Sequence, residues 1–206
     1  MKFLLNGMSL AIMLILLTIL SLFVGVSKVS ITDIFHLTQE QRNIIISSRI
    51  PRTVSIIISG STLALSGLIM QQMMQNKFVS PTTAGTMDWA KLGILISLIW
   101  FPQENIMIKL AFAVLLSVGG TFLFVKLVQL IRFKDVIFIP LLGIMLGGIV
   151  SSFATFIALK TNTVQSIGNW LTGNFAIITS GRYEILYLSI PLLILTYIFA
   201  NHFTIA

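Results

Sequence analysis

The side chains that could take part in chemistry are few, and they are spread singly along the 206 residues. The acids and the histidines are Asp33, His36, Glu40, Asp88, Glu104, Asp135, Glu184 and His202. Neither histidine has a second type of ligand at a spacing that suits a metal ion, so both are interpreted as solvated loop residues. Cysteine is absent, which excludes a thiol nucleophile and a cysteine-bound metal. We therefore predict no catalytic residues, no metal site and no cofactor held by this chain.

The sequence also lacks the loop that would bind a nucleotide phosphate. No G-x-x-x-x-G-K-[ST] motif occurs, so the chain is not predicted to be an ATPase of that type. One acid stands out because Asp88 lies three residues before Lys91, which places both on one face of a helix. Neutralisation of one charge by the other, or the preference of an acid for a helix N-terminus, explains this pair without a catalytic role.

The composition is that of a membrane protein. Hydrophobic residues make up 56% of the chain, charged residues only 9%, and the mean hydropathy is +1.01. Soluble domains are about a quarter charged, and this chain has too few polar side chains to cover a surface in water. The net charge of +7 comes from basic residues scattered between apolar runs, which predicts membrane flanks and no nucleic-acid partner.

Six apolar segments are long enough, or nearly so, to cross a hydrocarbon core as helices, which takes about 20 residues. They are Leu4–Val26, Val54–Gln75, Ala90–Phe101, Ile106–Ile131, Val136–Leu159 and Ile185–Phe199. The third is short, and its start lies between Thr86 and Ala90. A backbone that spans lipid must satisfy its own hydrogen bonds, so we predict an all-α, polytopic transmembrane helical bundle.

Small residues recur along one face of the fifth segment. Gly143, Gly147, Ser151 and Thr155 lie four positions apart and therefore share a helix face. Small faces let helix backbones approach closely in lipid, so helix packing is the favoured interpretation. The alternative is that this face lines a wide, weakly polar pathway. Between the fifth and sixth segments, Trp170 indicates a short interfacial or re-entrant helix, or an aromatic-belt residue.

A specific pattern occupies Arg49 to Gly93, where R-hydrophobic-P-R precedes a small-residue helix with G-x-x-x-Q and then Asn, Pro and Gly at fixed intervals. The matching residues are Arg49, Pro51, Arg52, Gly60, Ala64, Gly67, Gln71, Asn76, Pro81, Gly85, Ala90 and Gly93. This pattern resembles the permease subunits of ABC importers for iron–siderophores, haem and cobalamin. The form T-M-D-W-A-x-L-G is similar to a subgroup associated with catecholate siderophores. The chain departs from the family in Asn76-Lys77, where Asn-Pro is usual, and in Met87-Asp88-Trp89, where Ser and Gly are usual.

The resemblance implies a permease subunit of an ATP-driven iron–siderophore importer, with no enzymatic activity of its own. It implies three protein partners: a second permease subunit, identical or different, a cytoplasmic ATP-binding subunit that uses Mg-ATP, and an extracytoplasmic substrate-binding protein. Iron would pass as its siderophore chelate, and Gln71 joins the small face of the fifth segment as a candidate for the pathway or for packing. Members have about ten spans, so residues 1–206 would be the N-terminal part of one permease domain, without the C-terminal spans and the ATPase-coupling helices.

The orientation in the bacterial plasma membrane depends on this resemblance. The positive-inside rule alone favours an external N-terminus, because the loops that would then face inward carry more lysine and arginine. In the family the N-terminus is cytoplasmic, which places Arg49 and Arg52 on the outer face to meet acidic residues of the binding protein. Guanidinium groups suit this role through bidentate pairing with carboxylates, and anchoring at lipid headgroups is the alternative.

A secondary transporter, or another multispan membrane protein without an ATPase partner, is the alternative function. A secondary transporter would show functional intramembrane charges or inverted repeats, and the sequence shows neither.

Overall fold

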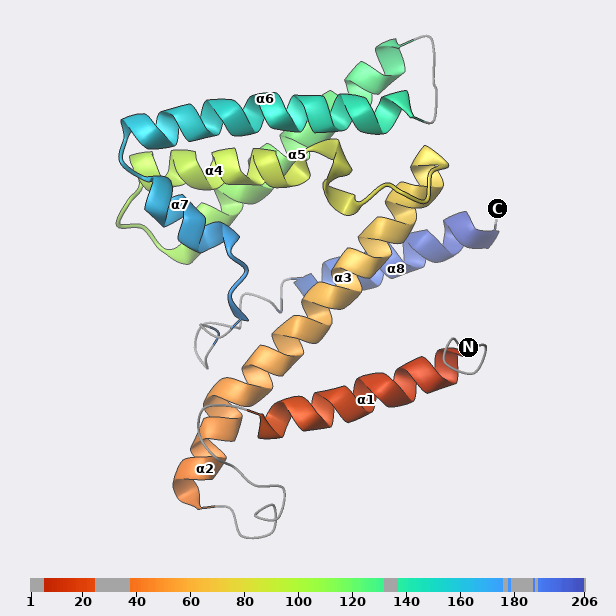
Figure 1. Cartoon of the computed structure of the whole chain (residues 1–206), viewed down its shortest axis with the longest axis vertical. Coiled ribbons are helices and arrows are strands. Elements are labelled where there is room, and N and C mark those ends of the chain that lie inside the picture. The colour runs from red at the N-terminus through yellow and green to blue at the C-terminus, as the bar shows by residue number, and fades with distance from the viewer. Residues whose placement is uncertain are drawn as a thin grey trace. The chain divides into compact units, whose positions relative to one another are not determined.

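The computed structural model describes residues 6–24, 38–131, 137–175, 178, 187 and 189–205, and this part of the chain is helical without strands (Figure 1). The elements are α1 (Gly7–Phe23), α2 (Gln39–Ile44), the π-helix η3 (Ile45–Arg49), α3 (Ile50–Met74), the 3-10 helix η4 (Pro81–Ala84), α4 (Thr86–Trp100), α5 (Ile106–Leu130), α6 (Phe138–Lys160), α7 (Val164–Leu171) and α8 (Ser189–Ile205). The all-α prediction is confirmed. Asp33, His36, Asp135, Glu184 and the side chain of His202 lie outside the described residues.

Three helices in the described part are long and apolar enough to cross a membrane: Gln39–Met74, Ile106–Leu130 and Phe138–Lys160. Two further apolar helices, Gly7–Phe23 and Ser189–Asn201, are shorter. Each of the six predicted apolar segments therefore contains a helix, but the bounds differ. The short third segment takes the earlier of its two predicted starts, at Thr86. Its 15 residues extend about 22 Å, less than a hydrocarbon core of ~30 Å.

The second segment starts earlier than predicted because the helix continues through Pro51. Proline lacks an N–H group, and its ring crowds the carbonyl four residues before it, so a proline inside a helix normally forces a kink. Here the turn just before Pro51 is the wider π-helix, in which the N–H of Ile50 bonds to the carbonyl of Ile45. A π-turn of this kind accommodates a local misfit without ending the helix.

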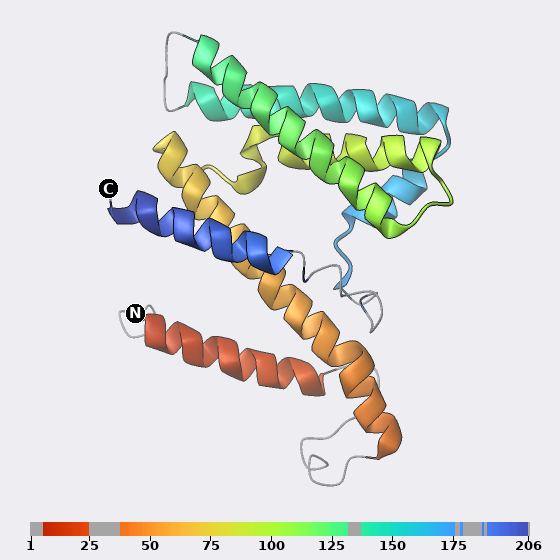
Figure 2. The ribbon, with the colours of Figure 1, turned by 180° about the vertical axis from the view of Figure 1, so that it is seen from behind.

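The chain forms two compact units. One comprises Met1–Ser61 with Asn174–Leu193, and the other comprises Thr62–Gly173 with Ile194–Ala206. In the second unit α4 packs against both α5 and α6, and Figures 1 and 2 show these three helices side by side. A small buried core joins α4, α6 and α7 through Leu95, Ala154, Ala158 and Ile167.

The contact between α4 and α5 depends on two glycines. A Cβ atom at Gly93 of α4 would overlap the carbonyl of Phe112, and one at Gly120 of α5 would overlap the indole of Trp89. The helix backbones therefore approach closely at Gly93, and the Trp89 ring covers Gly120. This is the packing that small residues permit between helices in lipid, where apolar burial gives little driving force.

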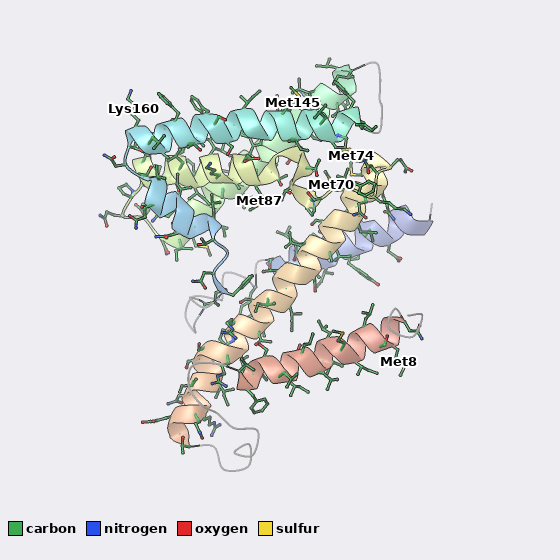
Figure 3. The ribbon with its side chains drawn as sticks, viewed as in Figure 1. Met8, Met70, Met74, Met87, Met145 and Lys160 are labelled. Atoms are coloured by element: carbon green, nitrogen blue, oxygen red, sulfur yellow. The ribbon has the colours of Figure 1, made fainter. Side chains whose placement is uncertain are left out.

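Large apolar side chains point outward from the helices. Met8 on α1 is 75% exposed and Met145 on α6 is 58% exposed, and both project away from their helices in Figure 3. Water would disfavour so many exposed apolar groups, whereas lipid solvates them. The outward-facing surface of these helices is thus suited to contact with hydrocarbon.

Candidate functional site

The small-residue face of α6 contacts η4 and the start of α4. A Cβ atom at Gly143 would overlap the carbonyl of Thr83. One at Gly147 would lie 3.1 Å from the Cα of Gly85 and 2.5 Å from Oδ2 of Asp88. The two backbones can approach this closely only because both positions on α6 are glycine.

The other two members of this face bind a lysine. Lys91 on α4 donates hydrogen bonds from Nζ to the Ser151 hydroxyl at 3.1 Å and to the Thr155 hydroxyl at 2.9 Å. The structure thus brings all four predicted residues of α6 together against η4 and α4. Residue numbers rise together along the two helices, so α4 and α6 run parallel. In this structure the face packs helices and also holds a cation.

Asp88 and Lys91 are not joined directly. No ion pair forms between them, or between Lys91 and any other acid, within the described part of the chain. Asp88 lies in the first turn of α4, where a carboxylate interacts favourably with the positive end of the helix dipole. The second of the two sequence interpretations therefore fits Asp88, and Lys91 has neutral hydroxyl partners that the sequence did not indicate.

Several residues of the sequence motif shape the loop between α3 and α4. Gln71 donates from Nε2 to the carbonyl of Val79 at 3.3 Å, and the side-chain oxygen of Asn76 accepts from the N–H of Phe78 at 2.9 Å. Gly85 has φ +74°, a left-handed conformation that favours glycine. Gly67 lies beside the ring of Pro81, from which a Cβ would be 3.7 Å away.

The first unit contains the two motif arginines, and they differ. Arg49 is only 5% exposed, and its Nη1 donates to the carbonyl of Leu22 at 2.6 Å. Nearby, the hydroxyls of Ser21 and Thr53 are 3.2 Å apart. Leu22 is in the last turn of α1, whose carbonyls have no partner within the helix and favour a nearby cation. Arg52 is half-buried, and no hydrogen bond or ion pair joins it to any of the residues that the structure describes.

The predicted short helix between the fifth and sixth segments is present as α7. Trp170 lies near its end, and the Nζ of Lys109 at the start of α5 is 6.0 Å from the ring centroid. The same ammonium donates to the carbonyl of Pro102 at 3.3 Å. Gly60, by contrast, has no atom near the position of a Cβ, so nothing in the structure explains a glycine there.

A family model described as the FecCD transport family matches residues 13–206. The chain belongs to the FecCD transport family. This FecCD chain is 52% identical over 195 residues to the petrobactin import system permease protein YclN of Bacillus subtilis, covering 95% of the chain and 62% of that protein. It is 35% identical over 185 residues to the ferric-anguibactin transport system permease protein FatD of Vibrio anguillarum, covering 90% of the chain and 59% of that protein.

A solved structure has the same fold as the FecCD chain. It is described as an inward-facing conformation of a metal-chelate type ABC transporter, with a TM-score of 0.71 and 24% identity. The match covers 88% of the chain and 57% of the solved one. The FecCD chain thus spans about three-fifths of the length of the relatives it matches. The resemblance drawn from Arg49 to Gly93 is confirmed, and the chain is a membrane protein of a transport family, whereas the roles of individual site residues stay predictions.

Proposed function

We propose that this FecCD chain is part of the transmembrane permease of an ATP-driven iron–siderophore importer. The observation that carries the proposal is 52% identity, over 95% of the chain, to a protein named as a petrobactin import permease. A second relative is named for ferric anguibactin, so ferric siderophores are the shared class of cargo. Ferric petrobactin is accordingly the first substrate to test.

The proposed assembly contains three kinds of partner. A second permease subunit would complete the pathway, a cytoplasmic ATP-binding subunit would supply the energy, and an extracytoplasmic binding protein would deliver the chelate. The names of the relatives, which refer to import and transport systems with permease components, support this assembly. Iron would enter as its siderophore chelate, with no cofactor held by this chain.

The N-terminus is proposed to be cytoplasmic, with α1 crossing the membrane once before Arg49 and Arg52 reach the outer side. There the two arginines would form the docking face for the binding protein. The structure supports a division of labour between them. No described residue accepts a hydrogen bond from Arg52, which leaves its donors for an acidic partner, whereas Arg49 is buried and bonded to Leu22, so that it holds the backbone beneath the docking face.

Iron uptake tests the proposed function. Cells with an in-frame deletion of the gene, in a strain without other siderophore importers, would be given radioactive iron as ferric petrobactin. We expect uptake to be lost, and to return when the gene is restored together with an intact ATP-binding subunit. Restoration that also occurs with an ATP-binding subunit unable to hydrolyse ATP would favour a secondary transporter. Unchanged uptake in the deletion strain would overturn the assignment to ferric petrobactin.

A further inference from the structure

We propose that Lys91 is an anion-binding residue of the translocation pathway, whose ammonium group attracts a negatively charged ferric siderophore as it passes α6. The inference rests on the proposed function and adds a specific residue and a specific interaction to it. It goes beyond the sequence prediction, which treated Lys91 only as a neutralising partner for Asp88.

The depth of the ammonium group is the first support. Its partner Ser151 is near the middle of α6, about 20 Å from the start at Phe138 and about 14 Å from the end at Lys160. Since α6 is long and apolar enough to cross a membrane, this level falls well inside the hydrocarbon core. A lysine at the centre of a span costs about 2.5–3.5 kcal/mol, and ionisable residues kept at such depth usually serve function.

The direction of the side chain is the second support. A lysine in lipid normally extends toward the nearer interface to keep its charge in water. Lys91 instead reaches sideways from α4 to two hydroxyls on the neighbouring helix. These hydroxyls hold the ammonium at this depth, and because they are neutral they do not cancel its charge.

The unused bonding capacity is the third support. An ammonium group has three donors, and Ser151 and Thr155 take two of them. No acceptor for the third is found in the described residues, and no carboxylate lies within ion-pair distance of Nζ in that part of the chain. A cation with a spare donor and no counterion favours an anionic ligand.

The side of α6 next to Lys91 is not covered by other described residues. Gly148, Ser152 and Thr155 share the face of α6 next to the α4 contact, because they are four and three residues apart. Ser152 and Thr155 are exposed, and a Cβ at Gly148 would meet no atom within 4 Å. We call these three residues the open face of α6. It offers small and hydroxyl side chains beside the cation, and the nearest described acid, Asp88, lies one helical turn away against Gly147 without an ion pair to Lys91.

The chemistry of the cargo matches this arrangement. A ferric chelate built from catecholate or carboxylate oxygens is an anion, because its ligand oxygens bring more negative charge than Fe³⁺ cancels. One fixed cation would favour entry of such a chelate, and neutral hydroxyls would not retain it. The competing interpretation is that Lys91 only fastens α4 to α6.

Cysteine labelling separates these interpretations without relying on transport. The chain contains no cysteine, so Ser152→Cys provides a single reactive thiol on the open face. In membranes containing the intact system, we expect an anionic thiosulfonate to react about tenfold faster than a cationic one of the same size, after correction for their rates with a free thiol. In the double variant with Lys91→Met the preference should disappear. Equal rates with Lys91 present, or no reaction from either side of the membrane, would overturn the proposal.

A second thiol position protects this test from a local folding defect. Gly148→Cys replaces a residue whose Cβ position is empty, so it should not disturb packing. It should show the same preference for the anionic reagent. Added ferric petrobactin should slow labelling at both positions, and unchanged labelling in a system that transports the chelate would also contradict a pathway role.

Uptake measurements then connect the site to transport. Lys91→Met at its chromosomal position should lower the rate of ferric petrobactin uptake about tenfold while the amount of permease in the membrane is retained, and Lys91→Arg should keep most of the rate. Lys160→Met removes a lysine at the exposed end of α6 (Figure 3) and should leave uptake unchanged. If the wild type takes up no ferric petrobactin, the proposed assignment to that chelate fails, and the labelling test still decides the role of Lys91. If Lys91→Met transports normally beside an active wild type, only the inference fails.

Discussion

Arg49 donates a hydrogen bond from Nη1 to the carbonyl oxygen of Leu22, 2.6 Å away, and thereby joins the π-helix η3 to the last turn of α1. The contact links residues 27 positions apart and is partly buried, and Arg49 itself is only 5% exposed. It makes Arg49 a structural residue of the first unit, whatever else it does.

Loss of the Arg49 guanidinium should therefore destabilise the protein. Hydrogen bonds to charged groups contribute about 1.5–3 kcal/mol, and removal of the donor leaves the Leu22 carbonyl without its cation. We expect Arg49→Met to lower the melting temperature of the detergent-solubilised permease. The matched control is Arg52→Met, which removes no hydrogen bond to any described residue. Equal losses in the two variants would contradict the division of labour between the arginines.

Charge reversal at Arg52 should weaken docking of the binding protein. An arginine that faces a carboxylate across an interface contributes strongly to affinity, so Arg52→Glu should reduce binding-protein affinity at least about tenfold. Surface binding of the purified binding protein to permease in nanodiscs would measure this. Arg42→Glu, which reverses an exposed charge on α2, should have a smaller effect. Unaltered affinity for Arg52→Glu would show that the proposed docking role is wrong.

Bulk added at Gly147 should separate α6 from α4, whereas bulk at the adjacent Gly148 should not. A side chain at Gly147 would press on Gly85 and Asp88, and a side chain at Gly148 would meet nothing. Overpacking of this kind costs about 1–3 kcal/mol. We expect Gly147→Val to reduce the yield of monodisperse protein on size-exclusion chromatography, and Gly148→Val to match the wild type. The reverse result would mean that α6 presents a different face to α4.

Alanine substitutions at two glycines with a left-handed backbone conformation distinguish the cost of backbone strain from the cost of tight packing. Gly85 and Gly173 have φ of +74° and +60°, so alanine should cost about 1 kcal/mol or more at either position. Only Gly85 also lies against α6, with its Cβ position 3.1 Å from the Cα of Gly147. Gly85→Ala should therefore lower thermal stability more than Gly173→Ala. Similar melting temperatures would indicate that the close contact relaxes easily.

The sequence predicted the elements better than it predicted their partners. Apolar length located a helix in every predicted segment, and the spacing of Gly143, Gly147, Ser151 and Thr155 identified the α6 face that packs. The helix that packs against this face of α6 could not be predicted. Small residues also crowd α3, and the spacing of small residues does not show which two helices pack together. The pairing of Lys91 with Ser151 and Thr155 depends on that choice, so it became visible only in three dimensions.

The candidate site shows a similar limit for Arg49. Its type and motif indicated an outward-facing guanidinium for a protein partner, but its bonding partner in the structure is a backbone carbonyl. Backbone acceptors are present at every residue and leave no mark on the sequence. The π-helix that precedes Pro51 is also hard to predict, because a proline ordinarily indicates the start of a helix and not a wider turn inside one.

Trp89 in the first turns of α4 and Gly85, the residue just before this helix, have a consequence for motion during a transport cycle. The indole ring rests on Gly120 of α5, while the backbone at Gly85 touches Gly147 of α6. A helix wedged in this way can neither roll about its axis nor slide along its neighbours without steric overlap, since packed interiors deform little. The α4–α5–α6 trio should therefore travel as one rigid body, leaving the rearrangement to hinges beyond it.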